Sequence, residues 1–448
     1  MDISESAKSA GAIGLKAAVD LCIRRPLLIL GLVCVGLINV LVGTSWEDVA
    51  FVQQRAFLVA AAVRIRTTFQ PHEQECPAWF SGMYEDLAPW KEKGSISAQD
   101  IEAALPGAAI HFTIIGGKLY AKEIKPCFPN RARYSTWGLL QLLRYFPGQV
   151  PDVDFVFECN DYPQMVRPKN PADPTPVLLN YDNREGKIDV PFPDWTFWGW
   201  PDLEIARWRD QSHRIDRAAR AGLKWIDREK TAFWKGAAWL NEARKALVRC
   251  TAEDPSFLLS AYDKSWGNVA AHETNFTDAR LEDQCGYRYR IYAEGSAWSV
   301  SIKYGLACGS TMLLVEPVFK AFYDHGLRDG ENCLVVPKHP ALCENMRDKV
   351  RWGNDNPELA GGIGEAGAKF ALEDLDMHNV YSYMLHLLKA YASLQDFVPG
   401  LHPDLKIVTE ASIRVESSDF EKRDYLLSEY PASRPPCIMP PGGETEEL

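Results

Sequence analysis

The chain has 448 residues, of which 46% are hydrophobic and 24% are charged, and both values are ordinary for a globular protein. This length predicts two domains of usual size rather than one small core. A formal net charge of −11 and an isoelectric point near 5.4 argue against a nucleic-acid partner, because binding to phosphates requires a basic surface.

A long apolar segment lies near the N-terminus. Between Arg25 and Glu47 there is no charged residue, and this length is sufficient to cross the hydrocarbon core of a bilayer. Basic residues precede the run and acidic residues follow it. The positive-inside rule therefore predicts a cytosolic tail at 1–25, a transmembrane signal anchor at 26–45, and a lumenal or external location beyond about 46. A cleaved signal peptide is the alternative, although the leader before the apolar run is long for one.

The cysteines fit the same topology. Of the 11 cysteines, Cys22 and Cys34 belong to the anchor region, and an oxidising lumen would permit disulfides among the other nine, with one left over. No Cys or His cluster has the spacing of a zinc site, so no structural metal site is expected. The sequon at Asn275 is a candidate glycosylation site in the lumenal region.

Helices and strands alternate after a short stem, which is expected at 46–75. A capped helix follows Ser97, a hairpin turns at Gly116, and the segment TWGLLQLLRYFPG predicts a helix. Apolar side chains at every second position from Val153 to Cys159 predict a strand with one buried face. A loop with Asp161 then follows. In open α/β sheets ligands bind at the carboxyl ends of strands, so an acid at this position suggests a function.

The second half of the chain repeats this alternation. A strand is expected at 231–236, a helix at 241–250, a strand, loop, helix and strand over 287–317, and a long amphipathic helix at 376–394. Alternating strands and helices predict an α/β fold with largely parallel sheets. The Pro- and Gly-rich C-terminal segment is expected to be mostly irregular.

Four segments, in chain order, carry a resemblance to a known family: CNDYPQ, FPDWTFWGW, FWKGAAWLNEAR and CGYRYRIYAEGSAWSVSIKYGLACGS. Together they resemble glycosyltransferase family 90, in its plant-type branch. This family includes the Rumi-like protein O-glucosyltransferases and the capsule-associated xylosyltransferases. The resemblance runs from about residue 76 to about residue 394.

The resemblance implies a GT-B architecture, in which two Rossmann-like domains face each other across a cleft. It places an acceptor domain at 76–205, a UDP-sugar domain with a returning C-terminal helix at 206–395, and a mostly irregular tail at 396–448. It also implies inversion of configuration with no metal and no other cofactor. The acids of the D-x-D pattern at Asp152 and Asp154, which could hold a metal in other glycosyltransferases, lead into a strand and are common by chance.

Asp161, in the motif NDYP, matches the catalytic base of the family. An inverting transfer needs a carboxylate to take the proton of the acceptor hydroxyl as its oxygen attacks C1 of the sugar. A turn aspartate that caps the next segment is the alternative for an isolated Asp-x-Pro.

The family match also places an aromatic segment along the acceptor groove, where flat rings offer contact area at a low entropic cost. This segment contains Trp195, Phe197, Trp198 and Trp200. Membership of the core is the alternative for at least two of them.

Donor binding is expected in the second domain, where a metal-free diphosphate site must use backbone N–H groups, a helix N-terminus and cations. The residues expected to bind the UDP-sugar are Gly236, Ala237, Arg244, Gly295, Ser296, Ala297, Trp298, Ser299, Ser301 and Lys303. Arg244 matches the nucleotide-contacting arginine of the family, and residues 295–299 are expected to open a helix. A solvated helix lysine is the alternative for Lys303.

Two further features follow from the resemblance. Cys285 and Cys308 match a disulfide pair of the family. Animal O-glucosyltransferases have a phosphate-binding arginine where Ser301 stands, and this difference leaves both UDP-glucose and UDP-xylose open as donor.

The sequence therefore predicts a single-pass type II glycosyltransferase of the Golgi or endoplasmic reticulum membrane. Its catalytic domain would be lumenal, and it would move glucose or xylose from a UDP-sugar to a hydroxyl of a secretory-pathway protein or glycan. Two alternatives stay open. One is a xylosyltransferase that acts on a cell-wall or capsular polysaccharide, and the other is a catalytically inactive, membrane-anchored, lectin-like protein.

Overall fold

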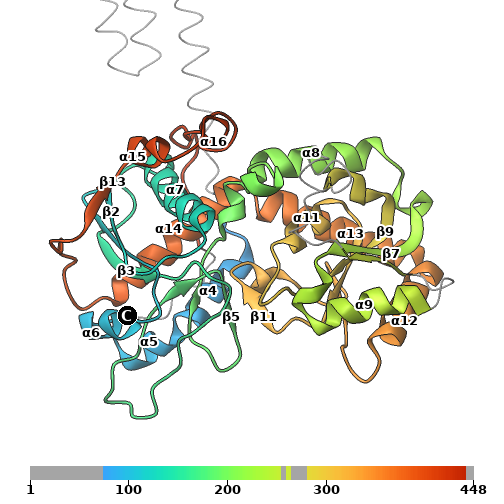
Figure 1. Ribbon diagram of the computed structural model, residues 1–448, viewed down its shortest axis with the longest axis horizontal. Coiled ribbons are helices and arrows are strands. Elements are labelled where there is room, and N and C mark those ends of the chain that lie inside the picture. Colours follow the sequence, from blue (N-terminus) through green and yellow to red (C-terminus); the bar gives the residue numbers. More distant parts are fainter. Residues whose placement is uncertain (1–73, 254–258, 264–279, 440–448) are drawn as a thin grey trace, which may run out of the picture. The chain divides into compact units, whose positions relative to one another are not determined.

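Two sheets organise the residues that the computed structural model describes, which are 74–253, 259–263 and 280–439 (Figure 1). The first sheet has six strands in the order β13–β2–β1–β3–β4–β6. Its strands are β1 (Ile110–Ile115), β2 (Lys118–Glu123), β3 (Val153–Phe157), β4 (Leu179–Asn180), β6 (Val190–Pro191) and β13 (Lys406–Val408).

The first sheet is mixed, so the expectation of largely parallel sheets is wrong for this half of the chain. β1 pairs antiparallel with both β2 and β3, and β13 pairs antiparallel with β2, whereas β3–β4 and β4–β6 are parallel. The reason lies in the connections. A two-residue turn at Gly116 and Gly117, both with positive φ, forces β1 and β2 into a hairpin. Helix α7 (Pro129–Tyr145) then returns the chain so that β3 lies antiparallel to β1.

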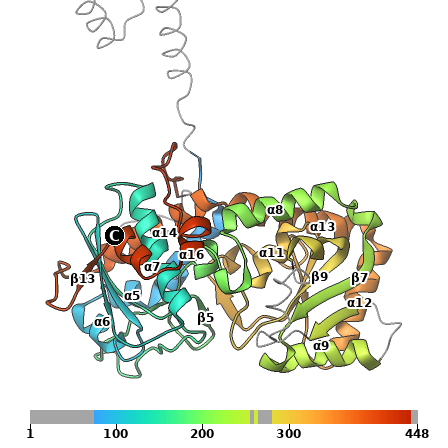
Figure 2. The same ribbon diagram turned by 45° about the horizontal axis from the view of Figure 1, so that its top comes forward.

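The second sheet is wholly parallel, as expected from the alternation of strands and helices. Its strand order is β12–β10–β9–β7–β8, and every neighbouring pair is parallel. The strands are β7 (Glu229–Gly236), β8 (Leu259–Asp263), β9 (Tyr287–Tyr292), β10 (Thr311–Val315) and β12 (Leu334–Val336). In Figures 1 and 2, helix α9 (Glu242–Glu253) lies on one side of this sheet and α8 (Trp208–Ala221) and α13 (Pro357–Lys369) on the other.

The remaining helices are short, with two exceptions. Helix α12 (Leu342–Asp355) packs against α9, and the long helix α14 (Met377–Leu394) packs against α7 and β3. The short ones are α4 (Gly82–Asp86), α5 (Ala88–Lys93), α6 (Ala98–Ala104), α11 (Ser301–Ala307), α15 (Glu410–Val415) and α16 (Asp419–Asp424). Helix α6 begins with the capping box expected at Ser97, in which Ser97 and Asp100 exchange hydrogen bonds.

A two-stranded ladder joins segments from the two halves of the chain. Strand β5 (Asp182–Arg184), which lies between β4 and β6 in the sequence, pairs antiparallel with β11 (Phe319–Ala321), which follows β10. Asp182 lies opposite Ala321 in this pairing. The ladder therefore holds the strand ends of the first half against those of the second.

The described part of the segment after residue 396, which ends at residue 439, is packed against the fold. It supplies the edge strand β13 and the two capped helices α15 and α16. Its last described part is tied to the start of the fold by the Cys76–Cys437 disulfide.

Four disulfides are present among the described residues. They are Cys76–Cys437, Cys127–Cys159, Cys250–Cys343 and Cys285–Cys308. Cys333 is buried and free, so the odd cysteine expected in this part of the chain is accounted for.

Four sequence predictions fall outside the described residues: the cytosolic tail at 1–25, the membrane anchor at 26–45, the stem up to residue 73 and the sequon at Asn275. Within the part of the chain that the structure describes, the longest and most apolar helices still fall short of what a bilayer crossing requires.

Candidate active site

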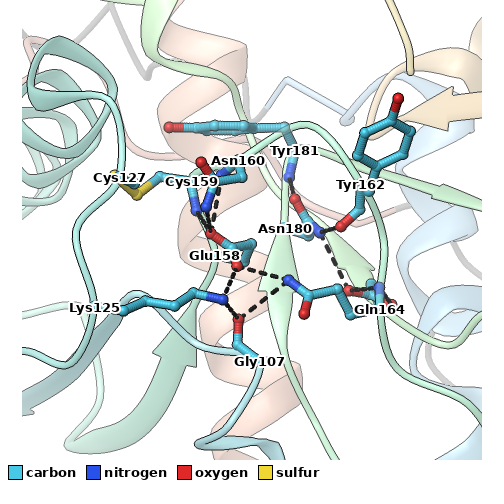
Figure 3. Close-up of polar contacts among 11 residues, drawn as sticks. Gly107, Lys125, Cys127, Glu158, Cys159, Asn160, Tyr162, Gln164, Asn180 and Tyr181 are labelled. Carbon is cyan, nitrogen blue, oxygen red and sulfur yellow. Dashed lines mark hydrogen bonds and ion pairs between the residues drawn. A yellow bond between two sulfur atoms is a disulfide. The ribbon is translucent and has the colours of Figure 1, made fainter. Parts of the chain in front are cut away.

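The loop after β3, which carries Asp161, is held by a fully buried carboxylate (Figure 3). Glu158 Oε1 accepts hydrogen bonds from the backbone N–H groups of Cys159 and Asn160 at 2.8 and 3.0 Å. Glu158 Oε2 lies 2.6 Å from Lys125 Nζ and 2.6 Å from Gln164 Nε2. Because the buried charge has both an ion-pair partner and backbone donors, it stabilises one path of the loop directly before Asp161.

Two more contacts fix this loop. The Cys127–Cys159 disulfide ties its start to the segment before α7. At its other end, the Asp189 carboxylate accepts hydrogen bonds from the backbone N–H groups of Gln164 and Met165. Asp161 therefore lies on a short loop that is anchored on both sides.

The Asp161 carboxylate itself is paired with Arg131 of α7. Arg131 Nη1 lies 2.5 Å from Asp161 Oδ1, and the side chain of Asp161 is 31% exposed. The guanidinium of Arg131 lies between two rings, 4.5 Å from the centroid of Phe128 and 4.4 Å from that of Trp195. The carboxylate is thus oriented by a held cation and still reachable by a reactant.

The aromatic segment expected along an acceptor groove lies mostly in the core. Trp195, Phe197 and Trp198 are each no more than 3% exposed, and Trp200 is half-buried. The Trp198 indole N–H donates to Tyr381 of α14 at 3.0 Å. This burial agrees with the alternative interpretation, that at least two of these rings belong to the core.

Lys303 lies beneath the same aromatic segment. Its side chain is fully buried, and Nζ is 2.6 Å from Thr196 Oγ1 and 3.4 Å from Asp194 Oδ2. Burial lowers the pKa of Lys303, and the Asp194 carboxylate opposes this effect. The solvated helix lysine that we considered is therefore wrong, and the ammonium ion points to the Asp194 turn rather than to an open phosphate site.

Three of the predicted donor residues, Gly236, Ala237 and Arg244, lie close together. Arg244, on α9, donates from Nη2 to the Ala293 carbonyl at 2.9 Å and from Nη1 to the Ala237 carbonyl at 3.2 Å. It therefore joins the end of β7, at Gly236 and Ala237, to the loop after β9. Burial lowers the pKa of Arg244 to about 10, so the guanidinium remains a cation at neutral pH.

The loop at 295–299 precedes a helix rather than opening it, which corrects the prediction for this segment. Helix α11 begins at Ser301, two residues after the loop. The contacts of Ser299 explain why the helix begins later than predicted. Its N–H donates to Tyr292 Oη at 3.1 Å, and its hydroxyl accepts from the N–H of Ser301. The Cys285–Cys308 disulfide, which the resemblance implied, links the start of β9 to the end of α11.

The Asp161 loop and the loop at 295–299, which we call the donor loop after its predicted role, meet through their aromatic residues. Trp298 of the donor loop lies 6.1 Å from Trp195 between ring centroids, and the ring of Tyr181 lies 5.2 Å from Trp195 and 5.4 Å from Trp298. The Trp195 ring also contacts the guanidinium of Arg131, which pairs with Asp161. A continuous series of contacts therefore joins Asp161 to the donor loop.

Three residues of this region carried no signal that the sequence reasoning used. Arg131 and Glu158 hold Asp161 and its loop, and Asp182 is a buried acid at the start of β5. Arg131 could have been suspected from its place four residues after Cys127, the partner of the cysteine in CNDYPQ. Asp182 could not, because only the folded chain brings β5 beside β11.

The D-x-D acids make structural contacts. Asp154 Oδ1 lies 2.7 Å from His111 Nε2 and 2.6 Å from Thr113 Oγ1, and Asp152 accepts from the N–H of Gly116. Among the described residues, one group brings three potential metal ligands within 4.8 Å of one another: Cys76, His386 and Cys437. Its two sulfur atoms are joined in a disulfide.

Comparison with known proteins decides the family. The family model described as "Glycosyl transferase family 90" matches residues 71–448. The chain belongs to glycosyl transferase family 90. As a family 90 member it is a glycosyltransferase, and the resemblance of its four motifs is confirmed.

Characterised relatives in this family are similar over most of their length. The O-glucosyltransferase rumi of Drosophila melanogaster is 26% identical over 337 residues, which cover 73% of this chain and 79% of the relative. Protein O-glucosyltransferase 1 of Homo sapiens is 25% identical over 336 residues, which cover 72% of this chain and 82% of the relative. Among solved structures, Anabaena HepE in complex with UDP and glucose covers 40% of this chain and 52% of its own at 11% identity, but the TM-score of 0.27 is too low to support a conclusion.

Proposed function

We propose that this family 90 glycosyltransferase transfers glucose from UDP-glucose to a hydroxyl of a protein in the secretory pathway, with inversion and without a metal ion. The relatives named above are protein O-glucosyltransferases, which favours glucose and a protein acceptor over xylose and a polysaccharide. The four disulfides of the described residues favour an oxidising compartment, in keeping with a lumenal catalytic domain behind an anchor at 26–45.

In the proposed reaction, Asp161 acts as the general base. The acceptor oxygen attacks C1 of the sugar, its proton passes to the Asp161 carboxylate, and the bond from C1 to the diphosphate breaks with its electron pair on UDP. Arg131 would hold the carboxylate in place. Glu158 would hold the loop, so that the base does not have to be ordered at each turnover.

The leaving diphosphate is expected to lie near the Arg244 guanidinium. Two backbone carbonyls occupy one side of this cation, and its other N–H groups can donate to a phosphate. The loop at 295–299 would add backbone N–H groups. A GT-B arrangement, with the first sheet on the acceptor side and the parallel sheet on the donor side, is part of this proposal.

The observation that carries the proposal is the unbroken set of contacts from Asp161 through Arg131 and Trp195 to Trp298 of the donor loop. The test is to incubate the purified chain with UDP-glucose or UDP-xylose in EDTA, and to measure release of UDP with and without a folded acceptor protein. We expect faster release with UDP-glucose, and none above background in Asp161→Asn. Binding of UDP-glucose without any release would instead support an inactive, lectin-like protein.

A further inference from the structure

Asp182 is a buried acid whose carboxyl group has no partner in the described structure. The residue is fully buried, it begins β5, and it lies opposite Ala321 of β11. Neither Oδ1 nor Oδ2 has a hydrogen-bond partner among the residues that the structure describes. A buried polar group without a partner costs free energy, so its presence requires an explanation, and a ligand that supplies the missing contact is one.

The surroundings keep this carboxyl group neutral. Burial raises the pKa of Asp182 to about 9, and four facing acids act in the same direction: Asp189, Asp161, Asp324 and Glu294. At neutral pH the group is therefore a carboxylic acid, with one O–H donor and a carbonyl oxygen that accepts.

Unpartnered donors lie in the same region. The indole N–H groups of Trp195 and Trp298 are buried and have no hydrogen-bond partner among the described residues. Both rings lie against Tyr181, the residue before Asp182, at centroid distances of 5.2 and 5.4 Å. Two donors without partners thus lie where the Asp161 loop meets the donor loop, and Asp182 directly follows the residue that both rings contact.

These groups suit a sugar hydroxyl better than a metal ion. A hydroxyl both donates and accepts, so it can pair with a neutral carboxyl group and with an indole N–H at once. Within the described ranges, no three of the neighbouring acids bring ligand oxygens within 4.8 Å of one another. A neutral acid is also a poor ligand for a cation.

We infer that Asp182 binds a hydroxyl group of the sugar that is transferred. The inference rests on the proposed function, because the transferred sugar must lie between the base, Asp161, and the UDP held by the donor loop. Asp182 belongs to the ladder beside this position, because β5 pairs with β11. Phe319 of β11 lies 6.4 Å between ring centroids from Tyr162, the residue after Asp161, and its N–H donates to Glu294, the residue before the donor loop.

The test compares the affinities for UDP-glucose and for UDP, measured by calorimetry on the wild-type chain, Asp182→Asn and Asp182→Ala. The Asn side chain keeps one donor and one acceptor in the same shape, so its UDP-glucose affinity should stay within about threefold of wild type. The Ala variant should lose about three- to tenfold in UDP-glucose affinity, the worth of one net hydrogen bond, and nothing in UDP affinity.

Asp154→Asn is the matched control, because Asp154 is also buried but has partners in His111 and Thr113. It should leave the ratio of the two affinities unchanged. Equal ratios in wild type and Asp182→Ala would overturn the inference while leaving the proposed function intact. If wild type binds neither ligand, the proposed function itself fails.

Thermal melting separates binding from a structural role. Both Asp182 variants should melt at or above the wild-type temperature, because each removes an unpartnered buried acid. If Asp182→Ala does not fold and Asp182→Asn melts earlier than wild type, Asp182 belongs to the core and the inference is wrong.

Discussion

Arg131 Nη1 donates to Asp161 Oδ1 over 2.5 Å, while the rings of Phe128 and Trp195 enclose the same guanidinium. The pair links a helix, α7, to the loop after β3. A planar cation between two rings has little freedom to turn, so the carboxylate that it contacts is fixed as well.

Replacement of the proposed base tests the reaction directly. In Asp161→Asn the size of the side chain is kept but the proton can no longer be accepted, so transfer should fall by about 10²–10⁴-fold. UDP affinity should not change, and the free energy of unfolding should stay within about 1 kcal/mol of wild type. Initial rates, UDP titration and urea melts check the three values. A near wild-type rate would show that Asp161 is only a turn residue.

Arg131 is expected to act through Asp161 rather than on the substrates. In Arg131→Lys the charge remains but the planar contact with the rings is lost, so kcat should fall by about tenfold with little change in KM for UDP-glucose. Arg131→Gln should lower kcat further than Arg131→Lys does. The control is Arg133→Lys, two positions further along α7, where Arg133 pairs with Glu421. A change in KM alone would contradict this role.

Arg244 is expected to bind the diphosphate. Arg244→Ala removes a charge-assisted contact, which typically costs about 1.5–3 kcal/mol, or roughly ten- to a hundredfold in UDP affinity. The same change also frees the Ala237 and Ala293 carbonyls, so some loss of stability is expected. Titration of UDP in EDTA measures the first effect and thermal melting the second. If binding to the wild-type chain disappears in EDTA, the enzyme needs a metal.

The pH dependence of stability tests the state of Asp182. Its pKa is raised from 3.8 to about 9 in the folded protein, so between these values the folded state holds a proton that the unfolded state has released. The stability of the wild type is therefore lowered progressively as the pH rises through this window. Asp182→Asn lacks this loss, and its advantage over wild type should grow from pH 5 to pH 8.5 by roughly 1.4 kcal/mol for each pH unit. An advantage that does not change with pH would contradict the neutral state.

The Cys285–Cys308 disulfide is expected to stabilise the donor half. It closes a loop with a sequence separation of 23 residues, worth about 3 kcal/mol in the chain-entropy model. The double variant Cys285→Ser, Cys308→Ser should unfold at lower urea concentration. Cys333→Ser, which changes the free buried cysteine, is the comparison that separates loss of the bridge from loss of a thiol.

The sequence was sufficient to predict elements whose signals are local. The β1–β2 hairpin follows from two glycines, and the parallel sheet of the second half follows from strands that alternate with helices. The acid after β3 could be singled out for the same reason, because a strand and its following loop are adjacent in the chain.

The rest depended on contacts between distant residues. β5 and β11 have three residues each, too few for a periodic signal, and they pair across more than a hundred residues. An aromatic run has the same sequence pattern whether it lines a groove or belongs to a core. Only the folded structure shows that Trp198 contacts α14 and that Phe197 lies against the buried Lys303. A missing partner, as at Asp182, has no sequence signal at all.

The Cys76–Cys437 disulfide also constrains how the protein is made. It joins residues separated by 361 positions, and β13, which completes the first sheet, lies only about thirty residues before the second cysteine. A ribosome must therefore release almost the whole chain before the first sheet has its edge strand and its covalent closure. The half of the protein that is synthesised first is finished last, and until then its β2 edge is open to other chains.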